Sequence, residues 1–75
     1  MKTYSNDNGR LSVFDENERL IGSYTHSFLE NQKQAIETQK ANEIANGAED
    51  TSQRDAEIAE VNLLLDKCNQ LNVTQ

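Results

Sequence analysis

The sequence predicts an α+β fold, with a small antiparallel β-hairpin or meander at about residues 2–24 and an antiparallel two-helix hairpin at about residues 28–46 and 52–71. Three observations predict it: an Asn-Gly turn between short strand-like segments, a set of helix start and stop signals, and an apolar stripe of helical period near the C-terminus. The 75 residues allow one domain, with the sheet in 1–24 and the helices in 27–75.

The first predicted turn is Asn8-Gly9, which lies between the strand-like segments Lys2–Ser5 and Arg10–Phe14. A type I′ turn needs positive φ at both central residues, and Asn and Gly adopt it at the lowest cost. The alternation in Leu11–Val13 gives one apolar and one polar face, as expected for an antiparallel sheet covered on one side.

A second turn is predicted at Asp15–Glu18, before a third strand-like segment, Arg19–Tyr24. The Asp15 side chain is suited to cap this turn, and Asn17 is suited to its left-handed position. Residues 1–24 are therefore expected to form a hairpin or a three-stranded meander.

The first helix is predicted to begin at a capping box, Ser27-Phe28-Leu29-Glu30. In this motif the Ser27 hydroxyl accepts a hydrogen bond from the backbone of Glu30, and the Glu30 carboxylate accepts one from the backbone of Ser27. The helix is expected to end at Asn46-Gly47, because Gly suits the left-handed residue that follows a helix.

The second helix has several possible caps, namely Asp50, Thr51 and Ser52. Negative charge at Asp55 and Glu57 lies in or just beyond its first turn, where it complements the helix dipole. Because the predicted loop is short, the two helices are expected to run antiparallel.

The two helices differ in their apolar faces. The second has a stripe about 140° wide that holds Ile58, Val61, Leu64, Leu65, Cys68 and Leu71. It is expected to run to about Leu71 and to leave a frayed tail. In the first helix Leu29, Ile36 and Ile44 line up, but Lys33 and Lys40 project from the same stripe. We therefore expect the first helix to touch its neighbour along one narrow seam.

The composition limits the classes of ligand. Thirteen acidic and seven basic side chains give a net charge of −6, which disfavours nucleic acid and anionic membranes. With Cys68 as the single cysteine and His26 as the single histidine, neither an intramolecular disulfide nor a Cys/His zinc site is expected, and no cofactor is predicted.

No segment resembles a signal peptide or a membrane span, so a cytoplasmic location is expected, in the host if the chain is phage-encoded.

An enzyme is not expected. His26 is the one candidate base of the usual kind, and its place at the predicted helix start favours a role in that junction. The acidic pairs Asp15-Glu16 and Glu49-Asp50 lie at predicted turns, where water keeps carboxylates ionised. A chain of this length buries only about 60% of its unfolded surface, which leaves little interior for a shielded reaction centre.

Two features indicate a contact surface instead. Leu63 lies nearly opposite the apolar stripe, either as an ordinary exposed leucine or as part of a second contact surface. Acidic residues gather at the tip of the helical hairpin and at the start of its second helix: Glu49, Asp50, Asp55, Glu57 and Glu60. Helix-dipole complementarity and solubility account for this acidic cluster, or it forms a face for a basic partner.

The sequence therefore predicts a non-enzymatic protein-protein interaction module that binds a protein partner or its own copy. Its small size, its abundance of Asn and Gln and its lack of family motifs are typical of phage or mobile-element accessory proteins that modulate a host protein. Two alternatives stay open. One is a structural or assembly component of a larger particle or homo-oligomer, and the other is an acidic DNA mimic that inhibits a nucleic-acid-binding protein.

Overall fold

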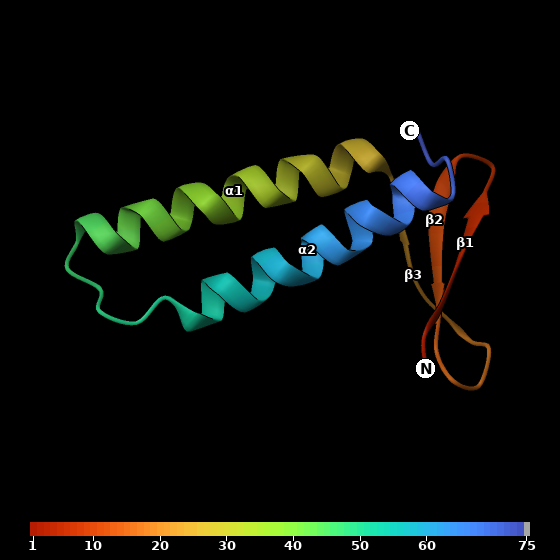
Figure 1. Cartoon of the computed structure of the whole chain (residues 1–75), viewed down its shortest axis with the longest axis horizontal. Helices are drawn as coiled ribbons and strands as arrows, with labels where there is room; N and C mark the ends of the chain where they lie inside the picture. The colour runs from red at the N-terminus through yellow and green to blue at the C-terminus, as the bar shows by residue number, and fades with distance from the viewer. Residues whose placement is uncertain (75) are drawn as a thin grey trace.

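The computed structural model, which describes residues 1–74, confirms the α+β fold. Three strands form an antiparallel sheet in the order β1-β2-β3, and two helices follow. The bounds are β1 Thr3–Asp7, β2 Arg10–Phe14, β3 Leu20–Tyr24, α1 His26–Ala45 and α2 Ser52–Gln70. The sheet stands at one end of the helical hairpin, which extends away from it, so the molecule measures 42 × 25 × 16 Å (Figure 1).

The first turn has the predicted geometry. Asn8 and Gly9 have φ values of 55° and 85°, and Asp7 pairs with Arg10 across the two-residue loop. The backbone N–H of Gly9 also donates to Asn6 Oδ1 at 2.9 Å. Local turn chemistry therefore fixes the register between β1 and β2.

The second turn was predicted correctly except for its left-handed residue, which is Glu18 (φ 63°) and not Asn17. Asp15 Oδ1 accepts hydrogen bonds from the backbone N–H groups of Asn17 and Arg19, each at 2.9 Å. Because the Asp15 carboxylate binds the backbone on both sides of Glu18, the left-handed conformation of the turn is adopted by Glu18.

β2 is the central strand and the most buried one. Its residues Leu11 and Val13 enter the core, as predicted. The predicted polar face of this strand is not fully exposed to solvent. Ser12 is buried, and it pairs with Ser5 of β1 and with Ser23 of β3. A small side chain on a central strand is shielded by the strands on both sides of it.

The capping box predicted at Ser27 is wrong, because Thr25 is the N-cap of α1. Its backbone is extended (φ −94°, ψ 156°), and its hydroxyl accepts the N–H of Phe28 at 3.1 Å. An N-cap needs this extended conformation, and Thr25 inherits it directly from the end of β3. The Glu30 carboxylate lies instead 3.4 Å from His26 Nε2, one turn back.

The end of α1 is confirmed. Gly47 has φ 90°, and its N–H donates to the carbonyl of Ile44 at 3.0 Å. The N–H of Ala48 donates to the carbonyl of Glu43 at 2.9 Å. These two bonds form a Schellman motif, which satisfies carbonyls that the helix leaves free.

Thr51 is the N-cap of α2, one of the three predicted candidates. Its hydroxyl donates to Asp55 Oδ2 at 3.1 Å, while Asp50 Oδ1 accepts the backbone N–H of Ser52 at 2.9 Å. Thr51 thus holds the N-cap position without a side-chain bond to the helix backbone, and Asp50 is the side chain that satisfies a backbone N–H there.

The frayed tail predicted after Leu71 is wrong. Asn72 takes a left-handed conformation (φ 59°), and the N–H of Val73 donates to the carbonyl of Cys68 at 2.8 Å. Val73 is 3% exposed and joins the core. Asn6 Nδ2 donates to the carbonyl of Leu71 at 2.8 Å, so the sheet also holds the tail. An apolar residue after a left-handed Asn is the expected side-chain pattern of such a helix end.

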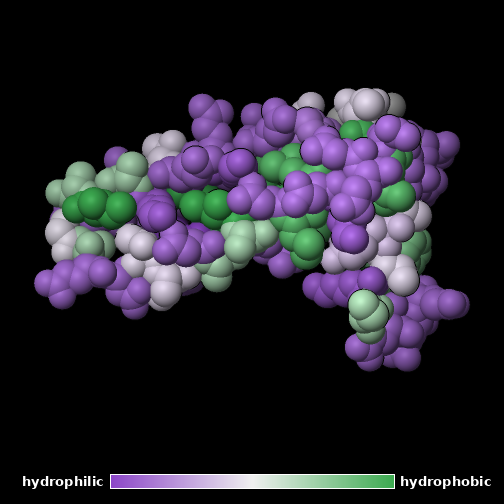
Figure 2. Space-filling view, viewed as in Figure 1, coloured by the Kyte–Doolittle hydropathy of each residue, from purple (hydrophilic) through white to green (hydrophobic). Residues whose placement is uncertain are grey.

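The core joins the sheet, both helices and the tail. It consists of Leu11, Val13, Leu29, Ile36, Val61, Leu64, Cys68 and Val73, with Tyr4, Tyr24, Ile58, Leu65 and Leu71 packed against it. Every member of the predicted α2 stripe is included. Ile44, predicted on the α1 seam, is 53% exposed, because the apolar seam ends before it. Figure 2 shows hydrophobic atoms between the helices and where they meet the sheet, with hydrophilic residues over most of the visible surface.

Candidate interaction surface

The half of the helical hairpin farthest from the sheet, here the distal half, is joined by charged side chains. Lys40 of α1 forms an ion pair with Asp55 of α2. Arg54 of α2 lies between two carboxylates, with its Nε 3.2 Å from Glu43 Oε1 and its terminal nitrogen bonded to Glu57. Its side chain is only 17% exposed. Lys40, one of the two lysines that interrupted the predicted seam, thus takes part in joining the helices.

These pairs change the interpretation of the acidic cluster. Asp55 and Glu57 are bound by Lys40 and Arg54, and Asp50 caps a backbone N–H. Bonding of this kind lowers the pKa of two of these carboxyls: Lys40 is the main cause at Asp55, and the Ser52 backbone at Asp50. The predicted acidic face is therefore partly satisfied within the chain.

The other two carboxylates of the cluster are Glu49 and Glu60, both of which are exposed. Within residues 1–74 neither one forms a side-chain hydrogen bond or an ion pair. Glu49 lies in the interhelical loop and Glu60 in the middle of α2, so they do not follow one another along a single turn of helix.

Leu63 lies on the outward side of α2 and is 41% exposed. This exposure agrees with its predicted place opposite the apolar stripe, whose members pack into or against the core while Leu63 does not. Its neighbours on that side of the helix, Ala56 and Ala59, are also exposed. Whether it contacts another chain stays a prediction.

The candidates for reactive chemistry have structural surroundings. Cys68 is completely buried, and burial raises the pKa of its thiol, which keeps it protonated and unreactive. His26 faces Glu30 within the first turn of α1. Over residues 1–74, no group of three or more His, Cys, Asp or Glu side chains is placed to hold a metal ion.

The outward face of α1 is a feature that we did not predict. At 100° per residue, about 160° of this helix carries no charged side chain. All ten residues of this uncharged face are exposed: Ser27, Phe28, Asn31, Gln34, Ala35, Thr38, Gln39, Ala41, Asn42 and Ala45. The signal is present in the sequence as the absence of charged residues from one side of the helix. We did not use it because the prediction followed the apolar positions alone.

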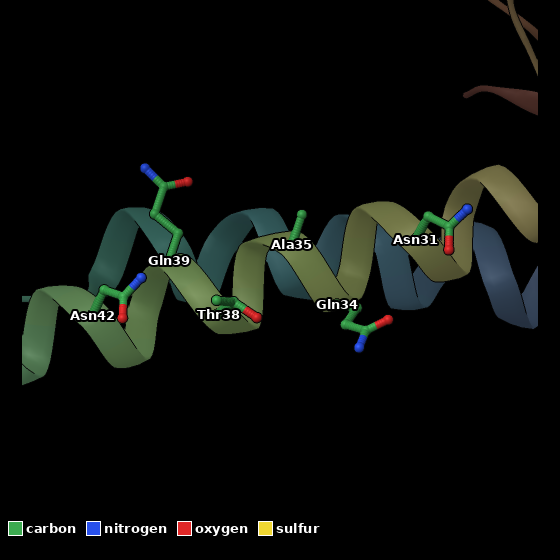
Figure 3. A pocket seen from close by; sticks show the side chains of 6 residues that line it. All are labelled: Asn31, Gln34, Ala35, Thr38, Gln39 and Asn42. Carbon is green, nitrogen blue, oxygen red and sulfur yellow. The ribbon is translucent and has the colours of Figure 1, made fainter.

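A shallow hollow lies on this uncharged face, lined by Asn31, Gln34, Ala35, Thr38, Gln39 and Asn42. All six belong to α1, and α2 lies behind them in Figure 3, so they point away from the hairpin seam. Their spacing is that of two successive holes, each framed by residues i, i+3, i+4 and i+7 of a helix. Such holes receive the side chains of a facing helix in knobs-into-holes packing.

None of the helices within residues 1–74 has the length and apolar character needed to cross a bilayer. Comparisons of the chain with protein-family models, curated proteins and solved structures found no match.

Proposed function

We propose that the chain is a non-enzymatic protein-protein interaction module that acts through the outward surface of its helical hairpin. The observation that carries the proposal is the exposed, uncharged face of α1, which runs along the whole helix in a protein where 27% of residues are charged. A solvent-facing helix surface ordinarily carries charged residues. Their absence from the ten positions on this one side of α1 indicates a surface that meets another protein.

Two further observations support the proposal. The core lies where the helices meet the sheet, so the sheet end holds the fold and leaves the outward hairpin surface available for binding. Leu63 adds an exposed large apolar residue on the outward side of the second helix. The composition supports the setting that we propose, a cytoplasmic accessory protein of a phage or mobile element that modulates a host protein.

The test uses three matched variants that each add one carboxylate at an exposed position: Ala35→Glu on α1, Leu63→Glu on α2 and Ser23→Glu on β3. A partner is first recovered with the tagged wild-type chain and identified by mass spectrometry. It is then purified, and its affinity for each chain is measured by calorimetry.

We expect Ala35→Glu to weaken binding by about tenfold or more, because the new charge must be desolvated inside the interface. Ser23→Glu should leave the affinity unchanged. If all three variants bind like the wild type, the hairpin does not carry the interaction and the proposal is wrong. A loss confined to Leu63→Glu would move the contact from α1 to α2.

The acidic DNA mimic has less support than the interaction module. A mimic needs free negative charge arranged like phosphates, whereas Asp55 and Glu57 are paired with cations of the same chain. The other alternative, a structural component or homo-oligomer, has a specific observation in its favour, which is the arrangement of residues on the uncharged face of α1.

A further inference from the structure

The uncharged face of α1 is unusually suited to contact with its own copy. With a net charge of −6 per chain, two copies repel one another over most of their surfaces. This repulsion is weakest where the outward residues carry no charge. Two copies can therefore associate through this face with less electrostatic repulsion than through the rest of the surface.

The six residues around the hollow read almost the same in both directions. Counting outward from the point between Ile36 and Glu37, the pairs at equal distance are Ala35 with Thr38, Gln34 with Gln39, and Asn31 with Asn42. This point lies at the centre of the helix on the side facing away from the uncharged face. When two copies of α1 pack antiparallel about a two-fold axis, the members of each pair face each other.

The chemistry of the facing pairs is self-complementary. An amide side chain both donates and accepts hydrogen bonds, so each Asn can bond to the facing Asn and each Gln to the facing Gln. Ala35 and Thr38 are small, which lets the two helix backbones approach closely at the axis. The same symmetry places the exposed ring of Phe28, near the start of α1, opposite the small Ala45 at its end.

We infer that the protein forms a two-fold symmetric dimer by antiparallel packing of α1 on α1 of a second copy. The inference rests on the proposed function of the hairpin as a contact surface and names its partner. Four helices then form one layered bundle, with the two sheets at opposite ends. The holes on each α1 receive the amide side chains of the other.

The first measurement is sedimentation equilibrium of the untagged chain up to about 1 mM. We expect a concentration-dependent dimer of twice the 8.5 kDa chain mass. Because salt screens the repulsion between two acidic chains, dimerisation should strengthen between about 0.05 M and about 0.5 M NaCl. An acidic face bound to a basic partner would show the opposite dependence.

The decisive variants are Ala35→Arg and Thr38→Glu, with Ala59→Arg as a matched control on the outward side of α2. All three positions are exposed, so circular dichroism should show the wild-type helix content. Ala35→Arg and Thr38→Glu should each weaken their own dimer by about tenfold or more, because like charges meet near the axis. An equimolar mixture of the two should restore the dimer, since the new guanidinium then faces the new carboxylate.

A wild-type chain that stays monomeric to about 1 mM would overturn the inference, as would a dimer that is dissociated by Ala59→Arg but not by Ala35→Arg. A mixture that fails to restore the dimer would overturn the antiparallel arrangement. These failures are separate from failure of the proposed function. A monomeric chain that loses a different partner through Ala35→Glu would refute only self-association.

Discussion

The two halves of the helical hairpin are held together by different forces. Next to the sheet, here the proximal half, Leu29 and Ile36 of α1 meet Val61, Leu64 and Cys68 of α2 in a closed apolar core. In the distal half, the same seam positions are occupied by charged residues that form ion pairs, and Ile44 is largely exposed. The seam thus changes from apolar to ionic as it leaves the sheet.

The two halves contribute differently to the free energy of unfolding. Burial of apolar side chains is worth about 1.5–3 kcal/mol each, whereas ion pairs near the surface contribute about 0–1 kcal/mol because water and salt screen them. The proximal half therefore holds the fold, and the distal half sets the alignment of the helices. A hairpin built in this way can present a long outward surface without a long apolar seam.

The largest expected effect is that of Leu11→Ala, which leaves a cavity where the sheet meets both helices. Leu11 is fully buried, so the change should cost about 3 kcal/mol. A domain of this size has about 3–5 kcal/mol in total, and the variant should be largely unfolded at moderate urea concentration. Urea unfolding followed by circular dichroism measures the loss. Leu63→Ala, on the outward surface, is the control. An equal loss of stability there would contradict the conclusion that the buried core holds the fold.

The tail tests whether the proximal core extends beyond the end of α2. Val73→Ala should lower the free energy of unfolding by about 1.5–2 kcal/mol, because it removes buried methyl groups. Thr74→Ala, at the next and exposed position, should change it by less than about 0.5 kcal/mol. If the two variants proved equally stable in urea, the tail would not be part of the core in solution.

Hydrogen exchange should separate the two halves directly. We expect the amide of Leu65, beside the apolar core, to be protected about tenfold or more above that of Glu57, near the ionic seam. The physical reason is that the distal turns can open without exposing the core. Exchange is read residue by residue by NMR, and equal protection at both positions would show that the hairpin opens only as a unit.

The smallest effect concerns the ion pair between Lys40 and Asp55. Its hydrogen bond from Lys40 lowers the pKa of Asp55 below 3.8, so the contribution to stability is present above that pH and is lost as the pH falls through the lowered value. Lys40→Ala should return the pKa towards 3.8, as followed by NMR of the Asp55 carboxyl carbon. The pKa of Asp50, lowered by the Ser52 backbone, should not move and serves as the control.

Much of the fold could be predicted because its signals are local. Asn8, Gly9 and Gly47 were predicted to take positive φ, and all three adopt it. The α2 stripe follows from helical periodicity alone, and all six of its members lie in or against the core. These features depend on residues within one turn or one helix, so the sequence pattern is enough to predict them.

The errors arose where distant parts of the chain decide the outcome. Ser27 has good capping chemistry, but the extended end of β3 gives that role to Thr25. The tail was expected to fray, although Asn72 before Val73 is a pattern that can end a helix in an ordered turn. The turn is stabilised only in the folded protein, where the core buries Val73 and Asn6 of the sheet bonds to the Leu71 carbonyl.

For the candidate site, the sequence by itself determined which residues are charged, which are apolar and which side of each helix they occupy. Only the tertiary structure decided that Lys40 meets Asp55 and Arg54 meets Glu43 across the two helices, and that the α1 face opposite the seam stays open to solvent. The physical reason is that helical periodicity fixes side-chain direction about one axis, whereas the pairing of charges and the covering of a face depend on how two axes pack together.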